Sequence, residues 1–250
     1  MDPRAEKHND IAELYDRMRP GYSKEMFKEL RQAAHLISTS RLLEIGAGTG
    51  QATQELVKIS SHVTALEPGP ELMSIAKKKV TRANFVQSTF ENFTSDEPFD
   101  CIFSASAWHW VDFTVGYKHA RELLSDHGYL AIASHYFVEP DPNAFLNRAQ
   151  PIFARFNTLI GLATADQIVA EKLNIESRDF HVVADYQLAW QQTYSTDEYI
   201  ALRNTFAAHQ WMNERSRKGL ERELRQLCES EYNGQVTISY RTALFVAAKK

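Results

Sequence analysis

The chain has 250 residues, of which 44% are hydrophobic, with a formal net charge of −4 and a pI near 6.1. That length and that hydrophobic content suffice for the core of one large α/β domain, so we expect a single domain over residues 1–250. The acidic balance, with no cluster of basic and aromatic residues, argues against nucleic acid as a partner.

Targeting and metal-binding patterns are lacking as well. The first residues contain no apolar signal region, and no apolar run approaches the roughly 18 residues of a membrane helix, so we expect a cytoplasmic protein that binds no membrane. Cys101 and Cys228 lie far apart, and the nine histidines are scattered without a ligand spacing. We therefore expect neither a disulfide nor a metal site, and the oligomeric state stays unknown.

Along the chain, a segment over residues 1–35 precedes a regular alternation of short apolar runs and helical patterns. The predicted strands are 41–45, 62–66, 84–86, 99–104 and 129–134, and the predicted helices are 51–59, 70–80 and 115–124. This alternation predicts a parallel sheet with helices on both faces. A ligand crevice is then expected where the first and fourth strands end.

The pattern changes in the second half of the chain. Residues 137–180 form a mostly helical insertion, which we interpret as a cap over the crevice, with a long surface connection as the alternative. Strands at 185–194 and 236–247 and helices at 196–203 and 214–229 follow. The closing pair of strands predicts an antiparallel sheet edge, which completes an α/β fold with a mostly parallel seven-stranded sheet.

The most informative segment is 41–50, which reads RLLEIGAGTG. An apolar strand ends there in Glu44, followed by Gly46, Gly48 and Gly50. Glycine adopts positive φ without a side-chain clash and allows a ligand to touch the main chain. A tight turn would explain two glycines, but the third and the preceding acid indicate a cofactor loop. A nicotinamide dinucleotide is the second choice, since the dinucleotide motif requires Gly or Ala where this chain has Gln51.

The same segment resembles the glycine motif of class I S-adenosylmethionine-dependent methyltransferases, a Rossmann-like fold. Residues 99–112, which read FDCIFSASAWHWVD, resemble the fourth-strand motif of the small-molecule subgroup that includes trans-aconitate methyltransferase. The resemblance implies transfer of a methyl group from S-adenosylmethionine to a small molecule. A nicotinamide-dependent oxidoreductase and a non-catalytic S-adenosylmethionine-binding module remain alternatives.

Most of the cofactor-binding residues are assigned through this resemblance. Glu67 ends the second strand, where its carboxylate can accept both ribose hydroxyls. Pro68 and Met73 are expected beside adenine. In the third-strand motif, Thr89 stands where the family often has Asp. The complete predicted set is Tyr15, Arg19, Glu44, Gly46, Ala47, Gly48, Gly50, Glu67, Pro68, Met73, Ser88, Thr89, Phe90, Ser104, Ala105 and Ser106.

Two further roles concern the reaction. Residues 15–22, YDRMRPGY, resemble the family's segment that folds over the cofactor, where Tyr15 would approach the sulfonium and Arg19 the methionine carboxylate. His109 is the candidate base, because its ordinary pKa of about 6.5 suits neutral pH. If the acceptor is a carboxylate, His109 only orients it. Arg148, Arg155 and Arg178, in or beside the cap, suggest an acidic acceptor, unless they are ordinary surface residues.

Overall fold

A computed structural model describes residues 11–139, 141–158 and 160–250. Residues 1–10 of the predicted amino-terminal segment and Pro140 and Leu159 of the predicted insertion lie outside these ranges. The elements in chain order are α2 (Ala12–Met18), α3 (Lys24–Ala33), β1 (Arg41–Ile45), α4 (Thr53–Ile59), β2 (His62–Leu66), α5 (Pro70–Lys79), β3 (Asn84–Val86), β4 (Phe99–Ala105), η1 (Trp108–Trp110), α6 (Gly116–Leu123), β5 (Leu124–Phe137), α7 (Phe145–Arg155), α8 (Ala165–Glu176), β6 (Phe180–Ser195), α9 (Thr196–Arg203), α10 (Ala207–Gln210), α11 (Glu214–Tyr232) and β7 (Gln235–Lys249).

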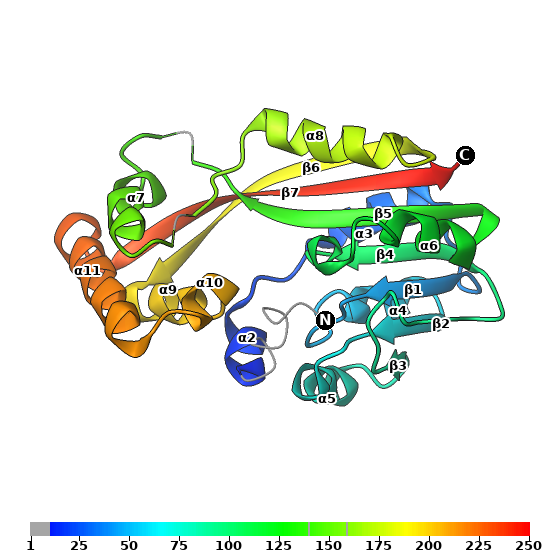
Figure 1. The fold of residues 1–250 in the computed structure, drawn as a ribbon, viewed down its shortest axis with the longest axis horizontal. Helices are drawn as coiled ribbons and strands as arrows, with labels where there is room; N and C mark the ends of the chain where they lie inside the picture. The colour runs from blue at the N-terminus through cyan, green and yellow to red at the C-terminus, as the bar shows by residue number, and fades with distance from the viewer. Residues whose placement is uncertain (1–10, 140, 159) are drawn as a thin grey trace.

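The strands form one seven-stranded sheet with the order β3-β2-β1-β4-β5-β7-β6 (Figure 1). β1 pairs in parallel with β2 on one side and β4 on the other, so the strand order reverses between β1 and β4. β7 runs antiparallel to both β5 and β6. This confirms the predicted mostly parallel sheet with an antiparallel last strand.

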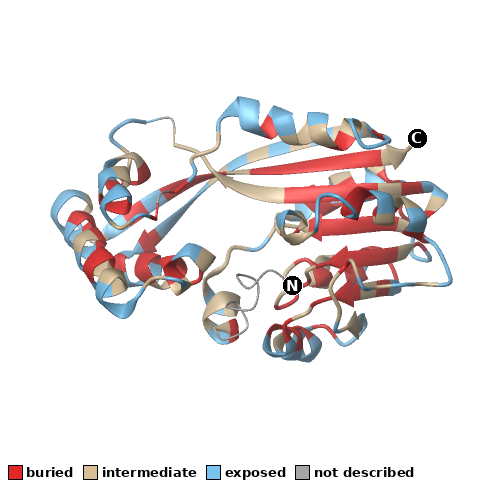
Figure 2. Ribbon diagram, in the orientation of Figure 1, coloured by how far each residue is buried: buried red, intermediate tan, exposed pale blue. Residues whose placement is uncertain are grey.

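Helices bury both faces of the sheet. On one face, Phe27 and Leu30 of α3 and Leu56 of α4 pack in a core with Leu42 of β1 and Phe103 of β4. The other face is covered by α6 and α8, whose apolar side chains pack in a second core with the alternate residues of the same strands. The central strands are buried over most of their length, whereas the outer faces of the helices are exposed (Figure 2). Burial on both faces explains why the central strands read as short apolar runs.

A third core lies beyond the end of the sheet. The helices α7, α9, α10 and α11, here called the helical cluster, gather around one end of the long strands β6 and β7 (Figure 1). Tyr194 of β6 and Ile238 of β7 pack there with Phe145, Tyr199 and Leu224 of the cluster. The same two strands therefore belong to the sheet and also pack against the helical cluster.

Several predicted boundaries differ from the structure because pairing extends the strands. β5 begins at Leu124 rather than at 129, since Leu124 pairs with Phe99 of β4. β6 begins at Phe180 rather than at 185, since Phe180 pairs with Lys249 of β7. These added residues include polar ones, which the hydrophobic pattern does not mark as strand. The predicted helix 51–59 begins at Thr53, after the glycine loop.

The predicted insertion 137–180 divides between two regions. α7 packs against α11 in the helical cluster, and α8 packs along β6 and β7 on the sheet. The connection between these two helices reaches the cavity described below through Ile160 and Gly161.

No helix within the described residues is long and apolar enough to cross a membrane. Cys101 and Cys228 are both buried and free, and Cys101 is a core residue, as its strand pattern indicates. Over the same ranges of the chain, no group of three or more His, Cys, Asp or Glu residues is arranged to hold a metal ion.

Candidate functional site

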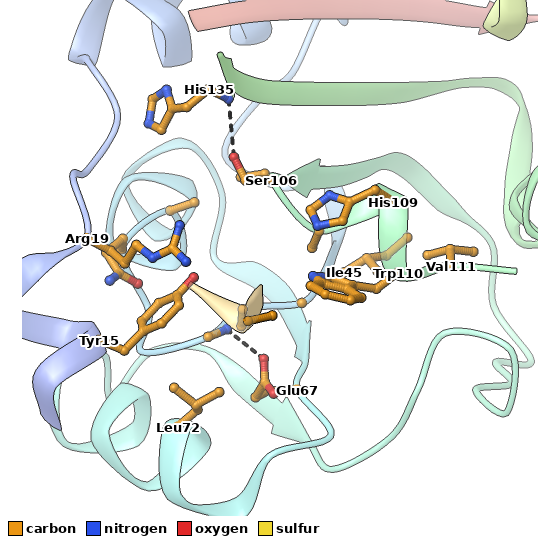
Figure 3. A pocket seen from close by; sticks show the side chains of 18 of the residues that line it. Tyr15, Arg19, Ile45, Glu67, Leu72, Ser106, His109, Trp110, Val111 and His135 are labelled. Atoms are coloured by element: carbon orange, nitrogen blue, oxygen red, sulfur yellow. Dashed lines mark hydrogen bonds between the residues drawn. The ribbon is translucent and has the colours of Figure 1, made fainter. Parts of the chain in front are cut away.

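A cavity of about 1000 Å³ opens at the carboxyl ends of β1 and β4, where the strand order reverses (Figure 3). This is the position at which open α/β sheets bind ligands. Its volume lies at the upper end of the roughly 300–1,000 Å³ typical of small-molecule sites. A cavity of this volume has room for more than one small ligand. Its lining comes from the sheet end, from the amino-terminal segment and from the helical cluster.

The glycine loop follows β1 and forms the floor of the cavity. Gly46, Gly48 and Gly50 have φ of 70°, 58° and 85°, in the left-handed region that other residues rarely adopt. A Cβ on Gly46 would lie 2.4 Å from the Cβ of Ala107, so a side chain there would collide with the neighbouring loop. A Cβ added at Gly48 would lie 3.8 Å from side-chain atoms of Gln51 and Tyr15, in ordinary contact, and Gly48 lines the cavity.

Glu67 lies at the end of β2 and is 6% exposed. Its Oε2 accepts from the Gly48 amide at 2.8 Å, and its Oε1 accepts from the Gly69 amide at 2.8 Å (Figure 3). Burial raises the pKa of this carboxyl, while the hydrogen bonds from the Gly69 and Gly48 amides oppose this increase. Each oxygen keeps a lone pair for a further donor, which suits a pair of ribose hydroxyls.

Glu44 is a second buried acid on the cavity lining, 1% exposed. Its Oε2 accepts from the Thr53 hydroxyl at 2.6 Å. Burial raises the pKa of Glu44 to about 7, against the Thr53 hydrogen bond, which lowers it. The nearby Gln51 also lines the cavity, and its Nε2 is buried without a hydrogen-bond partner among the described residues. Both groups therefore offer unused capacity for a polar ligand.

The raised pKa of Glu44 predicts how stability depends on pH. Because the folded pKa of about 7 exceeds the ordinary 4.5, the folded protein holds the proton more tightly than the unfolded chain does. This contribution, about 3 kcal/mol, is complete below pH 4.5 and is lost as the pH rises through about 7. In urea unfolding of the protein without ligand, we expect Glu44→Gln to remove this loss.

The difference between the wild-type and Glu44→Gln curves is the decisive quantity. Burial lowers the pKa of His135 to about 4 and that of His209 to about 3. The folded protein therefore loses stability through these two groups as the pH falls, whereas it gains stability through Glu44. The two histidines are present in both proteins and cancel in the difference. If the two curves remain parallel from pH 4.5 to 7.5, the raised pKa of Glu44 is wrong.

The amino-terminal segment contributes Tyr15 and Arg19 to the cavity, as the resemblance implies (Figure 3). The Arg19 Cζ lies 5.1 Å from the ring centroid of Tyr15 and 3.9 Å from that of Phe206. One Arg19 nitrogen, Nη2, donates to the Thr205 carbonyl at 3.0 Å, and its Nε is buried without a partner in the described chain. Arg19 is thus held in place from the helical cluster and retains donors for an anion.

Residues beyond Arg19 fasten this segment to the sheet. Tyr22 donates from its hydroxyl to Ser106 Oγ at 2.9 Å, and its ring stacks on His135 at 4.3 Å between centroids. His135 Nε2 lies 3.1 Å from the Gly21 carbonyl, which can only accept, so this nitrogen carries the proton. The Nδ1 of the ring lies 2.8 Å from Thr242 Oγ1. Neither Tyr22 nor His135 was identified from the sequence.

The third and fourth strands supply the opposite wall. Ser106 follows β4 with φ of 51°, and its hydroxyl faces Tyr22. Trp110 lines the cavity, whereas Trp108 packs into the core under the sheet. His109 is exposed and lies across the cavity from Tyr15 and Arg19 (Figure 3). The other predicted residues on the lining are Ala47, Pro68, Ser88, Thr89, Phe90 and Ala105.

Three predicted cofactor residues lie outside the lining. Ser104 is fully buried within β4, because alternation along the strand turns it into the sheet core. Gly50 faces Ala76 of α5, where a Cβ would lie 3.3 Å from that residue. Met73 is displaced by its neighbour Leu72, which lines the cavity, since successive residues of a helix point in different directions.

The arginines of the predicted cap do not reach the cavity either. Arg148 and Arg155 pair with Glu231 and Glu223 of α11. The Arg178 guanidinium lies over the ring of Phe113. A different arginine, Arg203 at the end of α9, lines the cavity and was not found from the sequence. Among the remaining unpredicted lining residues, the aromatic ones are Phe137, Phe206 and Tyr240.

Comparison with known proteins finds that part of this site lies in a segment that matches a protein family. Residues 43–132, which run from within β1 through the glycine loop to within β5, match the methyltransferase domain family. An uncharacterized methyltransferase of Mycobacterium bovis is 32% identical over 119 residues, which cover 47% of each chain. A probable S-adenosylmethionine-dependent methyltransferase of Saccharomyces cerevisiae is 25% identical over 51% of this chain and 45% of its own. The chain thus spans about half the length of these curated relatives.

Solved structures agree on the fold. An S-adenosylmethionine-dependent methyltransferase from Thiobacillus denitrificans, in complex with S-adenosyl-L-homocysteine, aligns with a TM-score of 0.55 at 14% identity, covering 96% of this chain and 97% of the other. The YcgJ protein from Bacillus subtilis aligns with a TM-score of 0.56 at 16% identity, covering 91% and 99%. Together the matches show that residues 43–132 resemble a methyltransferase domain and that the chain shares the fold of solved methyltransferases.

Proposed function

We propose that this protein transfers a methyl group from S-adenosylmethionine to a small-molecule acceptor. The observation that carries the proposal is the buried Glu67 carboxylate, bonded to the Gly48 amide beside a cavity of about 1000 Å³. As part of the same proposal, we place the protein in the small-molecule subgroup that the motif at 99–112 resembles. A cytoplasmic location belongs to the proposal too and rests on composition.

The residues present fit the cofactor. Glu67 would accept the ribose hydroxyls, and Gly48, which lines the cavity, would lie against the nucleoside. Arg19 would bind the methionine carboxylate with the donors that Thr205 leaves unused. Glu44, ionised beside a cation, would face the positive end of the methionine. When bound, S-adenosylmethionine supplies an activated methyl on a positively charged sulfur.

The chain's own task is then alignment and exclusion of water. Holding two reactants in line lowers the activation barrier by roughly 7–11 kcal/mol. Tyr15 and the segment fastened by Tyr22 cover the cavity from one side, and the helical cluster covers it from another. If the acceptor carries a proton, His109 is the group placed to remove it as the methyl carbon bonds to the acceptor.

His109→Ala should separate transfer from binding. We expect the affinity for S-adenosylhomocysteine to remain within about twofold and methyl transfer to slow by about 100-fold or more, because general-base catalysis contributes roughly 10²–10⁴. Calorimetry measures the binding, and radiolabelled methyl from the cofactor measures the transfer. His127→Ala, on the exposed part of β5, is the matched control. Equal loss of binding in His109→Ala and Glu67→Ala would reject their separate roles.

The proposal as a whole is tested by ligand choice and by turnover. S-adenosylhomocysteine should raise the unfolding midpoint of the wild-type protein, and NAD(H) should not. The reverse result would favour the oxidoreductase. Labelled methyl should leave the cofactor with at least one member of a panel of small acids, phenols and amines. If binding occurs but no label is ever transferred, the protein is better described as a binding module.

A further inference from the structure

A directed chain of hydrogen bonds runs from β6 through β7 and β5 to the amino-terminal segment. The Trp190 indole donates from Nε1 to Thr242 Oγ1 at 2.8 Å, and the same Oγ1 lies 2.8 Å from His135 Nδ1. On the other side of the ring, His135 Nε2 lies 3.1 Å from the Gly21 carbonyl. An indole nitrogen only donates and a carbonyl only accepts, so both ends of the chain are fixed in direction.

The fixed ends determine where each proton lies. Burial, with the Arg19 cation as a smaller contribution, lowers the pKa of His135 to about 4, against the hydrogen bond with Gly21, so the imidazole is neutral near neutral pH. A neutral imidazole has a single N–H, and the Gly21 carbonyl requires it on Nε2. Nδ1 must then accept, and its donor is the Thr242 hydroxyl, whose oxygen already receives the hydrogen of Trp190. Thr242 is therefore the residue that holds the ring in this tautomer.

The chain ends on a stretch of backbone that has no helix or strand of its own. Gly21 lies between α2 and α3, shortly after Arg19. The Tyr22 ring stacks on His135, and the Tyr22 hydroxyl donates to Ser106 Oγ, which also accepts from the His135 amide at 3.3 Å. The position of residues 19–22 thus depends on both the ring and the main chain of His135.

The residues behind His135 are held firmly and lie outside the cavity. Thr242 is 2% exposed within β7, and the Trp190 ring stacks on Tyr240 with 4.2 Å between centroids. Neither Thr242 nor Trp190 lines the cavity, whereas His135 and Arg19 both do. The hydrogen-bond chain therefore connects a buried strand pair to residues that face a ligand.

We propose that Thr242 is a positioning residue for cofactor binding, because its hydroxyl holds His135 against Gly21 and thereby places Arg19 for the methionine carboxylate. Trp190 has the supporting role of orienting that hydroxyl. The proposal rests on the proposed function, since it concerns how the same site binds its cofactor. It adds residues that do not touch the ligand and whose effect on affinity is transmitted through His135.

Thr242→Val tests this role with little change of shape, because it replaces the hydroxyl by a methyl group. We expect the affinity for S-adenosylhomocysteine to fall by about fivefold or more, the effect of roughly one hydrogen bond, since the contact of Arg19 with Thr205 remains. Methylthioadenosine, which has the same nucleoside but neither the carboxylate nor the ammonium of the amino-acid part, should bind within about twofold of wild type. Calorimetry measures both affinities.

Two further threonine variants serve as controls. Thr242→Ser keeps the hydroxyl and should bind S-adenosylhomocysteine within about twofold of wild type. Thr237→Val makes the same substitution on the same strand, where the hydroxyl lies 2.8 Å from Thr193 Oγ1, and should leave both affinities unchanged. Hydrogen exchange followed by mass spectrometry gives a readout without ligand. The amides of residues 19–22 should exchange faster in Thr242→Val than in wild type, whereas those of β1 and β4 should not.

The outcomes separate this proposal from the proposed function. Failure of S-adenosylhomocysteine to bind wild-type protein rejects the proposed function itself. If it binds, the positioning role is overturned by an unchanged affinity in Thr242→Val, by an equal loss for methylthioadenosine, by an equal loss in Thr242→Ser, or by unchanged exchange at residues 19–22.

A second pair of variants decides if Thr242→Val does not fold. His135→Gln keeps an N–H for the Gly21 carbonyl, whereas His135→Phe keeps only the stacking on Tyr22. His135→Gln should therefore bind S-adenosylhomocysteine more tightly than His135→Phe. Equal affinities, or the reverse order, would overturn the role of this hydrogen-bond chain.

Discussion

Glu67→Ala should weaken the binding of S-adenosylhomocysteine by at least about 100-fold, or about 3 kcal/mol, because hydrogen bonds to a charged group contribute roughly 1.5–3 kcal/mol each. The alanine removes the acceptor for both ribose hydroxyls and leaves the amides of Gly48 and Gly69 without their partner. Isothermal titration calorimetry measures the affinity directly.

The control for this variant is Glu214→Ala, which removes an acid of the same type from an exposed ion pair with Lys218. Its affinity should equal that of wild type. Thermal unfolding without ligand shows whether Glu67→Ala still folds, and Glu67→Gln, which keeps the volume, replaces it if it does not. An affinity within about threefold of wild type in a folded Glu67 variant would mean that ribose binds elsewhere.

The second large effect concerns the floor of the cavity. Gly46→Ala should destabilise the protein by roughly 2–4 kcal/mol, since a left-handed backbone is strained for alanine and an overpacked contact adds to it. The new Cβ would lie 2.4 Å from that of Ala107, so the loop after β4 has to move. Because this loop carries Ser106 and His109, we expect cofactor affinity to fall as well.

Urea unfolding measures the loss of stability in Gly46→Ala, and Gly21→Ala is its matched control. Gly21 has no atom within 4 Å of an added Cβ and no positive φ, so this change should alter stability by less than about 0.5 kcal/mol. Similar stability of the two variants would show that the contact between the glycine loop and Ala107 yields easily.

Local sequence patterns predicted most of the fold and the part of the cavity at the sheet end. The glycines of 46–50 and the acid Glu67 stand next to strands whose hydrophobic runs are plain in the sequence, and parallel strands bring their carboxyl ends to one edge. The differences between the predicted residues and the cavity lining are local too. Leu72 lines the cavity in place of Met73, because a helix turns by about 100° per residue and its exact rotation is not written in a short motif.

The side of the cavity next to the helical cluster depends on contacts between distant parts of the chain. Arg203 reaches the cavity because α9 packs on β6 and α2, and nothing in its immediate sequence marks it. The ring of His135 is positioned by hydrogen bonds with Gly21 and Thr242, each more than a hundred residues away from it in the sequence. The arginines near the predicted insertion were the natural candidates from composition, yet acids of α11 neutralise two of them.

The continuity of β6 and β7 has a mechanical consequence. Their ladder runs unbroken from Phe180 and Lys249 in the sheet to Ser195 and Gln235 among the helices, apart from one register shift. Such a continuous two-stranded ladder resists hinging, so the helical cluster and the sheet end keep a fixed separation. The segment at Gly21 and Tyr22 is held instead by side-chain hydrogen bonds to His135 and Ser106, which cost less to break than a strand ladder.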